Sequence, residues 1–223
     1  MSNLKMSNMK IGLIKNYCFS LLICFLSFST SAFAQEVGEI RQIANKMFED
    51  MNSRDYDAIL EMTHPKVFEI ISKDQMKTVL KSTFEGGNEY SIEIPKETPD
   101  FKISKIFKES ENNLSYAFIT YDMTMKMTFH NQTFDDEAKK VMAGVMKSKD
   151  MDVTFISNNA MNVLMNNRMT IVLKDKVTKN KWVMINYDPD SPLFYQILSS
   201  VVLEKAKTYK QDLMLENKKK QEN

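Results

Sequence analysis

The sequence predicts an α+β fold in which N-terminal helices pack on an antiparallel sheet and a further helix ends the domain. Two observations lead to this prediction. Apolar residues recur every three or four positions as far as Phe84, as they do on helices that cover a core. After Gly86 and Gly87 they alternate with polar residues, which is typical of strands with one buried face. No repeat and no flexible linker divides the chain, so we expect one domain over 35–215.

The helical part divides into four segments. An apolar stripe predicts the first helix over 37–52. Asp55 can cap a short second helix, and Pro65 suits the first turn of a third helical stretch. Ser72 and Gln75 have the spacing of a capping box at the start of a fourth, which the following glycine pair is expected to end.

The strand signal is clearest between Leu114 and Phe129, where every second residue is apolar. A strand of this length, roughly 50 Å at about 3.3 Å per residue, is expected to bend or to contain a bulge. Shorter alternating runs precede it at 89–95 and 101–107, and a hairpin is expected over 168–187. One face of the long strand carries Ala117, Ile119, Tyr121, Met123, Met125, Met127 and Phe129.

The segment 131–166 fits this alternation less well. Asp135 can cap a helix that follows it. The stretch 151–167 is compatible with a strand and a short helix, or with a second hairpin, and the pattern does not choose between them. A final helix is expected over 193–215, and a charged tail over 216–223.

The first thirty-four residues have the layout of a secretory signal peptide. Lysines precede an apolar run over 17–28, and Ala32 and Ala34 occupy the −3 and −1 positions of a cleavage site. We therefore expect cleavage after Ala34 and a secreted or periplasmic location. The run is shorter than the roughly 20 residues that span a bilayer, which disfavours an N-terminal anchor. Bulky residues before Cys18 and Cys24 disfavour a lipoprotein, and cleavage removes both thiols.

Composition excludes several classes of partner and cofactor. Basic and acidic residues are nearly balanced, 30 against 29, so no nucleic-acid surface is expected. Beyond the signal segment, no apolar stretch approaches membrane-spanning length. The chain has no glycine-rich phosphate loop, and its two histidines, His64 and His130, lie at unrelated positions without a neighbouring carboxylate. We expect neither a metal site nor a cofactor.

Four short segments resemble the NTF2-like superfamily, which includes the SnoaL-like proteins. The segment 55–60 and the following Thr63-His64-Pro65 resemble the entry and exit of that superfamily's second helix. The stretches 169–173 and 181–185, the latter with Trp182, resemble its closing hairpin. Together with the order of helices and strands, the resemblance covers roughly 36–130 and 167–203.

The resemblance implies a cystatin-like α+β cone, in which a curved sheet wraps around the first helix and leaves a pocket between them. It makes the segment 131–166 an insertion. The superfamily contains isomerases, dehydratases and cyclases as well as proteins that bind without catalysis, so membership does not select a function.

An isomerase or lyase of this kind would need a pocket carboxylate with a shifted pKa and a tyrosine hydroxyl. The candidates are Asp55, Tyr56, His64 and Asp122, with Asp57 as a further acid and Tyr121 as a further hydroxyl. Each also has a structural interpretation: His64 can tuck against the turn at a helix end, and Asp122 can lie on a solvated face of the long strand. The catalytic sets of the superfamily's isomerases and dehydratases have no counterpart at these positions.

Methionine is unusually frequent, with 18 in the chain. Met161, Met165 and Met169 follow one another at four-residue steps, in addition to those of the long strand. Thioethers bind Cu(I), but methionine more often fills irregular gaps in a core. A third interpretation is a pliable apolar pocket for a lipid-like or aromatic ligand. Its expected lining is Tyr121, Met123, Met125, Met127, Trp182 and Met184.

These observations together lead us to expect an exported, non-catalytic protein that binds a small apolar ligand or a partner in the cell envelope. One alternative is an isomerase or lyase with an Asp/Tyr pair in the pocket. Another is an interaction protein, for example a homodimer, that presents apolar surface from 131–166 and from the C-terminal helix.

Overall fold

The computed structural model of this protein describes residues 34–221 except 111, 190 and 192–193. The predicted signal peptide falls outside the described residues apart from Ala34, so it stays a prediction. The chain separates into two units, residues 1–39 and 40–223, and the second unit is described by itself.

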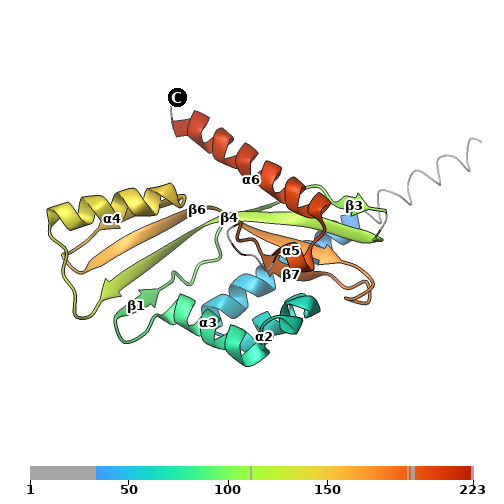
Figure 1. The fold of residues 1–223 in the computed structure, drawn as a ribbon, viewed down its shortest axis with the longest axis horizontal. Coiled ribbons are helices and arrows are strands. Elements are labelled where there is room, and N and C mark those ends of the chain that lie inside the picture. The colour runs from blue at the N-terminus through green and yellow to red at the C-terminus, as the bar shows by residue number, and fades with distance from the viewer. Residues whose placement is uncertain (1–33, 111, 190, 192–193, 222–223) are drawn as a thin grey trace, which may run out of the picture. The chain divides into compact units, whose positions relative to one another are not determined.

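The second unit has the predicted α+β fold. Helices pack on one face of a curved, open, seven-stranded antiparallel sheet, and a long C-terminal helix lies along the other face (Figure 1). We call the first the inner face and the second the outer face. None of the helices in the described part of the chain combines the length and the apolar character needed to cross a membrane.

The predicted caps form in the N-terminal helices. A helix through 40–53 is followed by α2 (Tyr56–Glu61), the 3-10 helix η1 (Pro65–Glu69) and α3 (Lys73–Glu85). The Asp55 carboxylate accepts a hydrogen bond from the backbone N–H of Ala58 at 3.0 Å, and Ser72 and Gln75 form the capping box of α3. Gly86 ends α3 with φ 84°, where a Cβ atom would lie 2.2 Å from the carbonyl oxygen of Tyr90.

The sheet is built on two long strands, β4 (Leu114–Phe129) and β6 (Ala160–Lys174), which pair antiparallel along most of their length. Three short strands pair with β4 and two with β6. Those on β4 are β1 (Tyr90–Glu93), β2 (Phe101–Ile103) and β3 (Phe107–Glu109); those on β6 are β5 (Met151–Phe155) and β7 (Val183–Asn186).

The stretch with two open interpretations is a second hairpin. After α4 (Asp136–Ser148), which Asp135 caps as predicted, β5 turns back into the first half of β6 and pairs with it. Both strands belong to the same sheet as β4, and α4 packs along β5. The insertion suggested by the resemblance therefore contributes strands to the main sheet.

The irregularity expected in the long strand β4 is a β-bulge, and its extra residue belongs to the partner strand β6. Tyr121 pairs with Arg168, but Met123 pairs with Met165, so two steps along β4 match three along β6. Asn167 lies within this extra step with φ 51°, a left-handed conformation that asparagine tolerates better than most residues.

Each face of the sheet has its own apolar core. On the inner face, Ala117, Ile119 and Tyr121 pack with the helix over 40–53 and with α2. On the outer face, Tyr116 and Phe118 pack with the C-terminal helix, and Phe118 is fully buried. The outer face of β4 is thus covered along its first half, and its polar, exposed part begins at Asp122.

The C-terminal helix differs from the expected range of 193–215. It is divided into α5 (Phe194–Ile197) and α6 (Ser200–Gln221), and α6 continues through most of the predicted tail. Glutamate, lysine and glutamine in this tail are good helix formers, and the Asn217 amide donates a hydrogen bond to the Asn167 side chain at 2.7 Å.

Candidate functional site

A cavity of about 320 Å³ lies among α3, the helix over 40–53, α5 and the inner face of the sheet. Its volume is at the lower end of the roughly 300–1,000 Å³ typical of ligand pockets. Most of its wall is apolar, and seven methionines contribute to it. They are Met47, Met51, Met76, Met123, Met125, Met165 and Met184.

One wall of the cavity is the helix α3, none of whose residues is buried. Its apolar side chains Met76, Leu80 and Phe84 line the cavity, and Val79 beside them is 51% exposed. The helix packs against α2 and β1. An apolar helix face that borders a void lacks the dispersion contacts of a packed interior. A molecule in the cavity would supply those contacts.

The wall also holds a few polar groups. Thr170 is almost fully buried, and its hydroxyl contacts the Met47 sulfur at 3.9 Å. Burial raises the pKa of the Tyr121 hydroxyl, whereas a hydrogen bond from Thr170 and the positive charge of Arg168 act in the opposite direction. The other polar residues of the wall are Thr63, Thr83, Asn186, Asp188 and Ser191. A few polar groups in a mostly apolar wall can orient a bound molecule.

The residues expected to line a pocket divide into two groups. Tyr121, Met123, Met125 and Met184 line the cavity. Met127 does not, because it lies nearer the end of β4, where it pairs with Ile92 and Met161. Trp182 is buried in the inner core instead, with the Lys174 ammonium 4.8 Å from its ring centre.

The catalytic candidates at the start of α2 have structural roles. Asp55 caps that helix, and Asp57 forms an exposed ion pair with Lys77 at 2.6 Å. The Tyr56 hydroxyl donates a hydrogen bond to the Glu85 carboxylate at 2.9 Å. Burial and, secondly, this hydrogen bond raise the pKa of Tyr56 to about 12. None of these side chains lines the cavity.

His64 connects the end of α2 to the sheet. Its backbone N–H donates to the carbonyl oxygen of Met184 at 3.1 Å, and its ring is 1% exposed. The ring Nδ1 accepts from the backbone N–H of Lys66, which leaves the proton on Nε2, 3.4 Å from the Asp175 carboxylate. Burial lowers the pKa of His64, although Asp175 opposes this, so the neutral ring is favoured. Its environment matches the structural interpretation.

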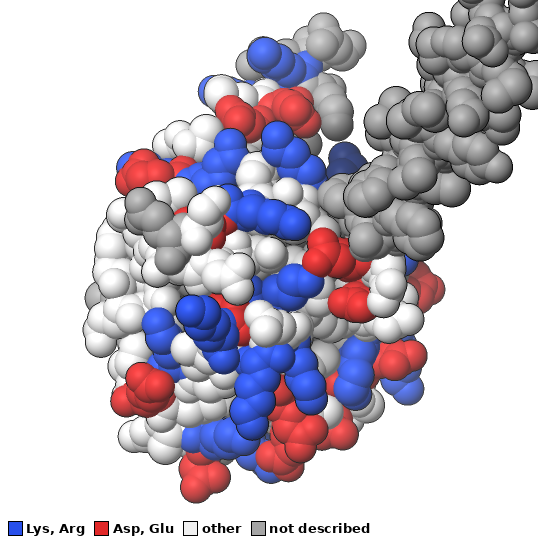
Figure 2. All heavy atoms as spheres, turned by 90° about the vertical axis from the view of Figure 1, so that its right-hand side faces the viewer, with Lys and Arg blue, Asp and Glu red and all other residues white. Residues whose placement is uncertain are grey.

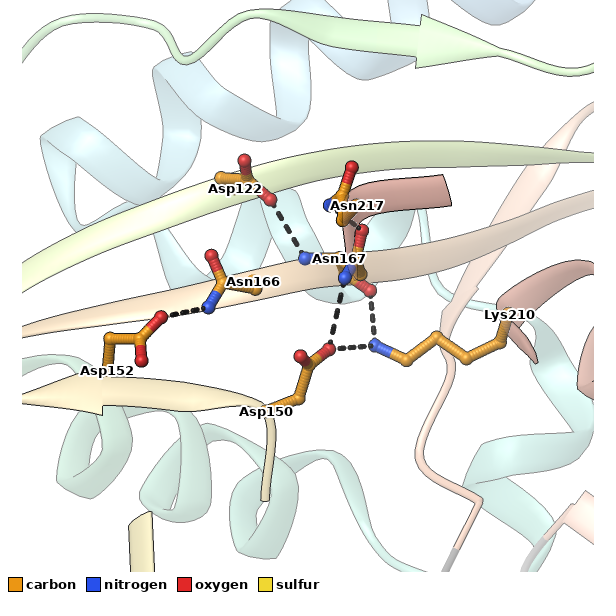
Figure 3. A network of polar contacts seen from close by, with 7 residues as sticks. All are labelled: Asp122, Asp150, Asp152, Asn166, Asn167, Lys210 and Asn217. Carbon is orange, nitrogen blue, oxygen red and sulfur yellow. Dashed lines mark hydrogen bonds and ion pairs between the residues drawn. The ribbon is translucent and has the colours of Figure 1, made fainter. Parts of the chain in front are cut away.

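Asp122 lies on the outer face, away from the cavity. Its exposed carboxylate accepts a hydrogen bond from the backbone N–H of Asn167 at 2.8 Å, in the polar network of Figure 3. Asp55 and Tyr56 adjoin at the start of α2, whereas His64 and Asp122 lie elsewhere, and none of these four side chains lines the cavity.

Sequence reasoning missed the lining residues of α3 and the cation Arg168. It also grouped Met165 with Met169, although Met165 lines the cavity and Met169 belongs to the outer core. The bulge between them reverses the alternation of the strand. The consecutive asparagines Asn166 and Asn167 within an apolar run were the available signal.

Charge and metal-ligand clusters give no second candidate in the described part of the chain. Figure 2 shows basic and acidic side chains interspersed over one face of the molecule. No three or more His, Cys, Asp or Glu side chains among the described residues are placed to hold a metal ion.

Compared with protein-family models, with curated proteins and with solved structures, the chain matched none. Its function therefore has to be inferred from its own residues.

Proposed function

We propose that the protein is an exported, non-catalytic binding protein of the NTF2-like type that holds a small apolar ligand in the cavity beside α3. The observation that carries this proposal is the cavity itself, a void of about 320 Å³ with seven methionines in its wall. Engineered apolar cavities of about half this volume take up benzene in water.

The composition of the wall suits a ligand of variable shape. Thioether side chains are flexible and polarizable, so they adapt to ligands better than branched aliphatic side chains do. Leu80 and Phe84 of α3 pack partly against the inner core, and no residue of the helix is buried, so a ligand adds contacts to an incompletely covered apolar face. Each Å² of apolar surface removed from water contributes about 25 cal/mol.

The alternatives make different demands on the molecule. An isomerase or lyase needs an acid–base pair in contact with its substrate. Asp55, Asp57 and Asp122 do not line the cavity, so this alternative has no support from their positions. An interaction protein would use exposed apolar side chains such as Val141 and Val145 of α4, and it stays a prediction.

Native mass spectrometry of the protein purified from the exported fraction of expressing cells tests the proposal. We expect a monomer that begins at Gln35 and carries a small-molecule adduct, which is lost on denaturation. A bare monomer would contradict ligand binding, and a chain that retains residues 1–34 would contradict export with cleavage. A bare dimer would favour the interaction protein.

A matched pair of variants identifies where the adduct is held. Leu80→Trp places an indole in the cavity wall and is expected to abolish the adduct. Lys81→Trp adds the same bulk to the exposed neighbour on α3 and should leave the adduct in place. An adduct that survives Leu80→Trp would be bound elsewhere.

A further inference from the structure

The bulge in β6 directs Arg168 into the cavity. Met165 and Arg168 both line it, although an unbroken strand would place residues three apart on opposite faces. Because the extra residue reverses the alternation, both side chains point inward, opposite Met123 and Tyr121 of β4. Without the bulge, one of the two would lie on the outer face.

The bulge is supported by a network on the outer face of the sheet (Figure 3). Its centre is Asn167, whose backbone N–H donates to the Asp122 carboxylate and whose carbonyl oxygen accepts from the Lys210 ammonium of α6. Lys210 also pairs with Asp150 at 3.2 Å, and Asn217 donates to the Asn167 side chain. Three segments of the chain, namely β4, α6 and the residue before β5, thus hold the bulge, so the direction of Arg168 is built into the fold.

Arg168 supplies the cationic group of the cavity wall. The side chain is half-buried, and it makes no hydrogen bond or ion pair with any residue that the structure describes. Asp188 lies in the same wall, but the described residues show no ion pair between the two. A guanidinium has five N–H donors and keeps its charge at any physiological pH. Beside a largely apolar void, these donors remain available to a ligand.

We infer that the ligand is a small amphiphilic monocarboxylate, whose carboxylate is bound by Arg168 while its apolar part lies among the methionines. This inference rests on the proposed function. The planar fork of a guanidinium matches a carboxylate in two parallel hydrogen bonds, and the hydroxyls of Tyr121 and Thr170 lie in the same wall. A fatty acid of moderate length, or an aryl carboxylate, combines a carboxylate with an apolar part of a size that suits the cavity.

Calorimetric titration with octanoate and 1-octanol at neutral pH tests the inference, because the two probes share an apolar chain and differ in the charged group. The protein is purified from the exported fraction and freed of adduct. We expect octanoate to bind about 10- to 100-fold more tightly than 1-octanol, the range of a charge-assisted hydrogen-bonded pair. Equal affinity, or tighter binding of 1-octanol, would overturn the carboxylate assignment while the apolar cavity stands. If neither binds, the proposed function itself fails.

Variants of the cation then locate the effect. Arg168→Gln is expected to weaken octanoate binding about 10- to 100-fold and to leave 1-octanol binding unchanged, which also shows that the variant is folded. Arg168→Lys keeps the charge and should restore part of the preference. Lys207→Gln removes an exposed charge from α6 and serves as the control for net charge. A preference that persists in Arg168→Gln would overturn the role of Arg168.

Discussion

Replacing Met125 by lysine is expected to lower the free energy of unfolding by about 3 kcal/mol or more, as judged from urea denaturation. Met125 is 6% exposed, belongs to the inner core and borders the cavity. A lysine there must either leave its ammonium in an apolar wall or lose its charge, and both cost stability. Its neighbours across the sheet, including Val163, offer no acceptor side chain.

Thr124→Lys is the matched control, because Thr124 is the preceding residue of β4, lies on the outer face and is exposed. We expect it to change the free energy of unfolding by no more than about 0.5 kcal/mol. A larger loss in Thr124→Lys would show that the two faces of β4 are assigned the wrong way round, and similar losses in both variants would contradict the difference in burial between them.

Asn167→Val is expected to cost a comparable amount, about 3 kcal/mol. A β-branched residue is strained at φ 51°, which accounts for about 1–2 kcal/mol. The substitution also removes the side-chain amide of Asn167, which accepts a hydrogen bond from Asn217 and donates one to the Asp150 carboxylate at 3.3 Å. Because Asn167 is only 7% exposed, water does not readily replace these bonds. If the bulge shifts as a result, Arg168 turns away from the cavity, so octanoate affinity should fall as well.

Asn167→Gly separates the two contributions. Glycine adopts a positive φ without strain but has no side chain to join the network, so it should cost clearly less than valine. Urea denaturation and octanoate titration of both variants provide the measurement. Valine and glycine variants as stable as the wild type, with unchanged octanoate affinity, would show that the network does not hold the bulge.

The local features of this fold could be predicted from the sequence because neighbouring residues determine them. The predicted helix caps form at Asp55, at Ser72 with Gln75, and at Asp135. A cap needs only a side chain and the backbone of the next turn, so it can be read from neighbouring residues. The inner face of β4 was also predicted correctly, because its alternation spans the whole strand.

Features that depend on distant segments could not be predicted in this way. The apolar outer face of β4 at Tyr116 and Phe118 gave no indication that α6, far along the chain, covers it. The bulge at Asn167 depends on partners in β4, α6 and the residue before β5. The cavity lies where α3 packs only partly against the inner core, since none of its residues is buried. Hydrophobic periodicity alone cannot distinguish a helix face that is fully packed from one that borders a void.

Methyl-detected NMR of protein labelled at its methionine methyl groups tests the central claim most directly, since seven methionines line the cavity. On titration with 1-octanol, we predict shifts of these seven methyl signals. Met169, which is buried in the outer core, and Met214, which is exposed on α6, should not shift. Shifts at Met169 or Met214 of the same size as those at the cavity, or no shift at saturating 1-octanol, would contradict a ligand site between α3 and the sheet.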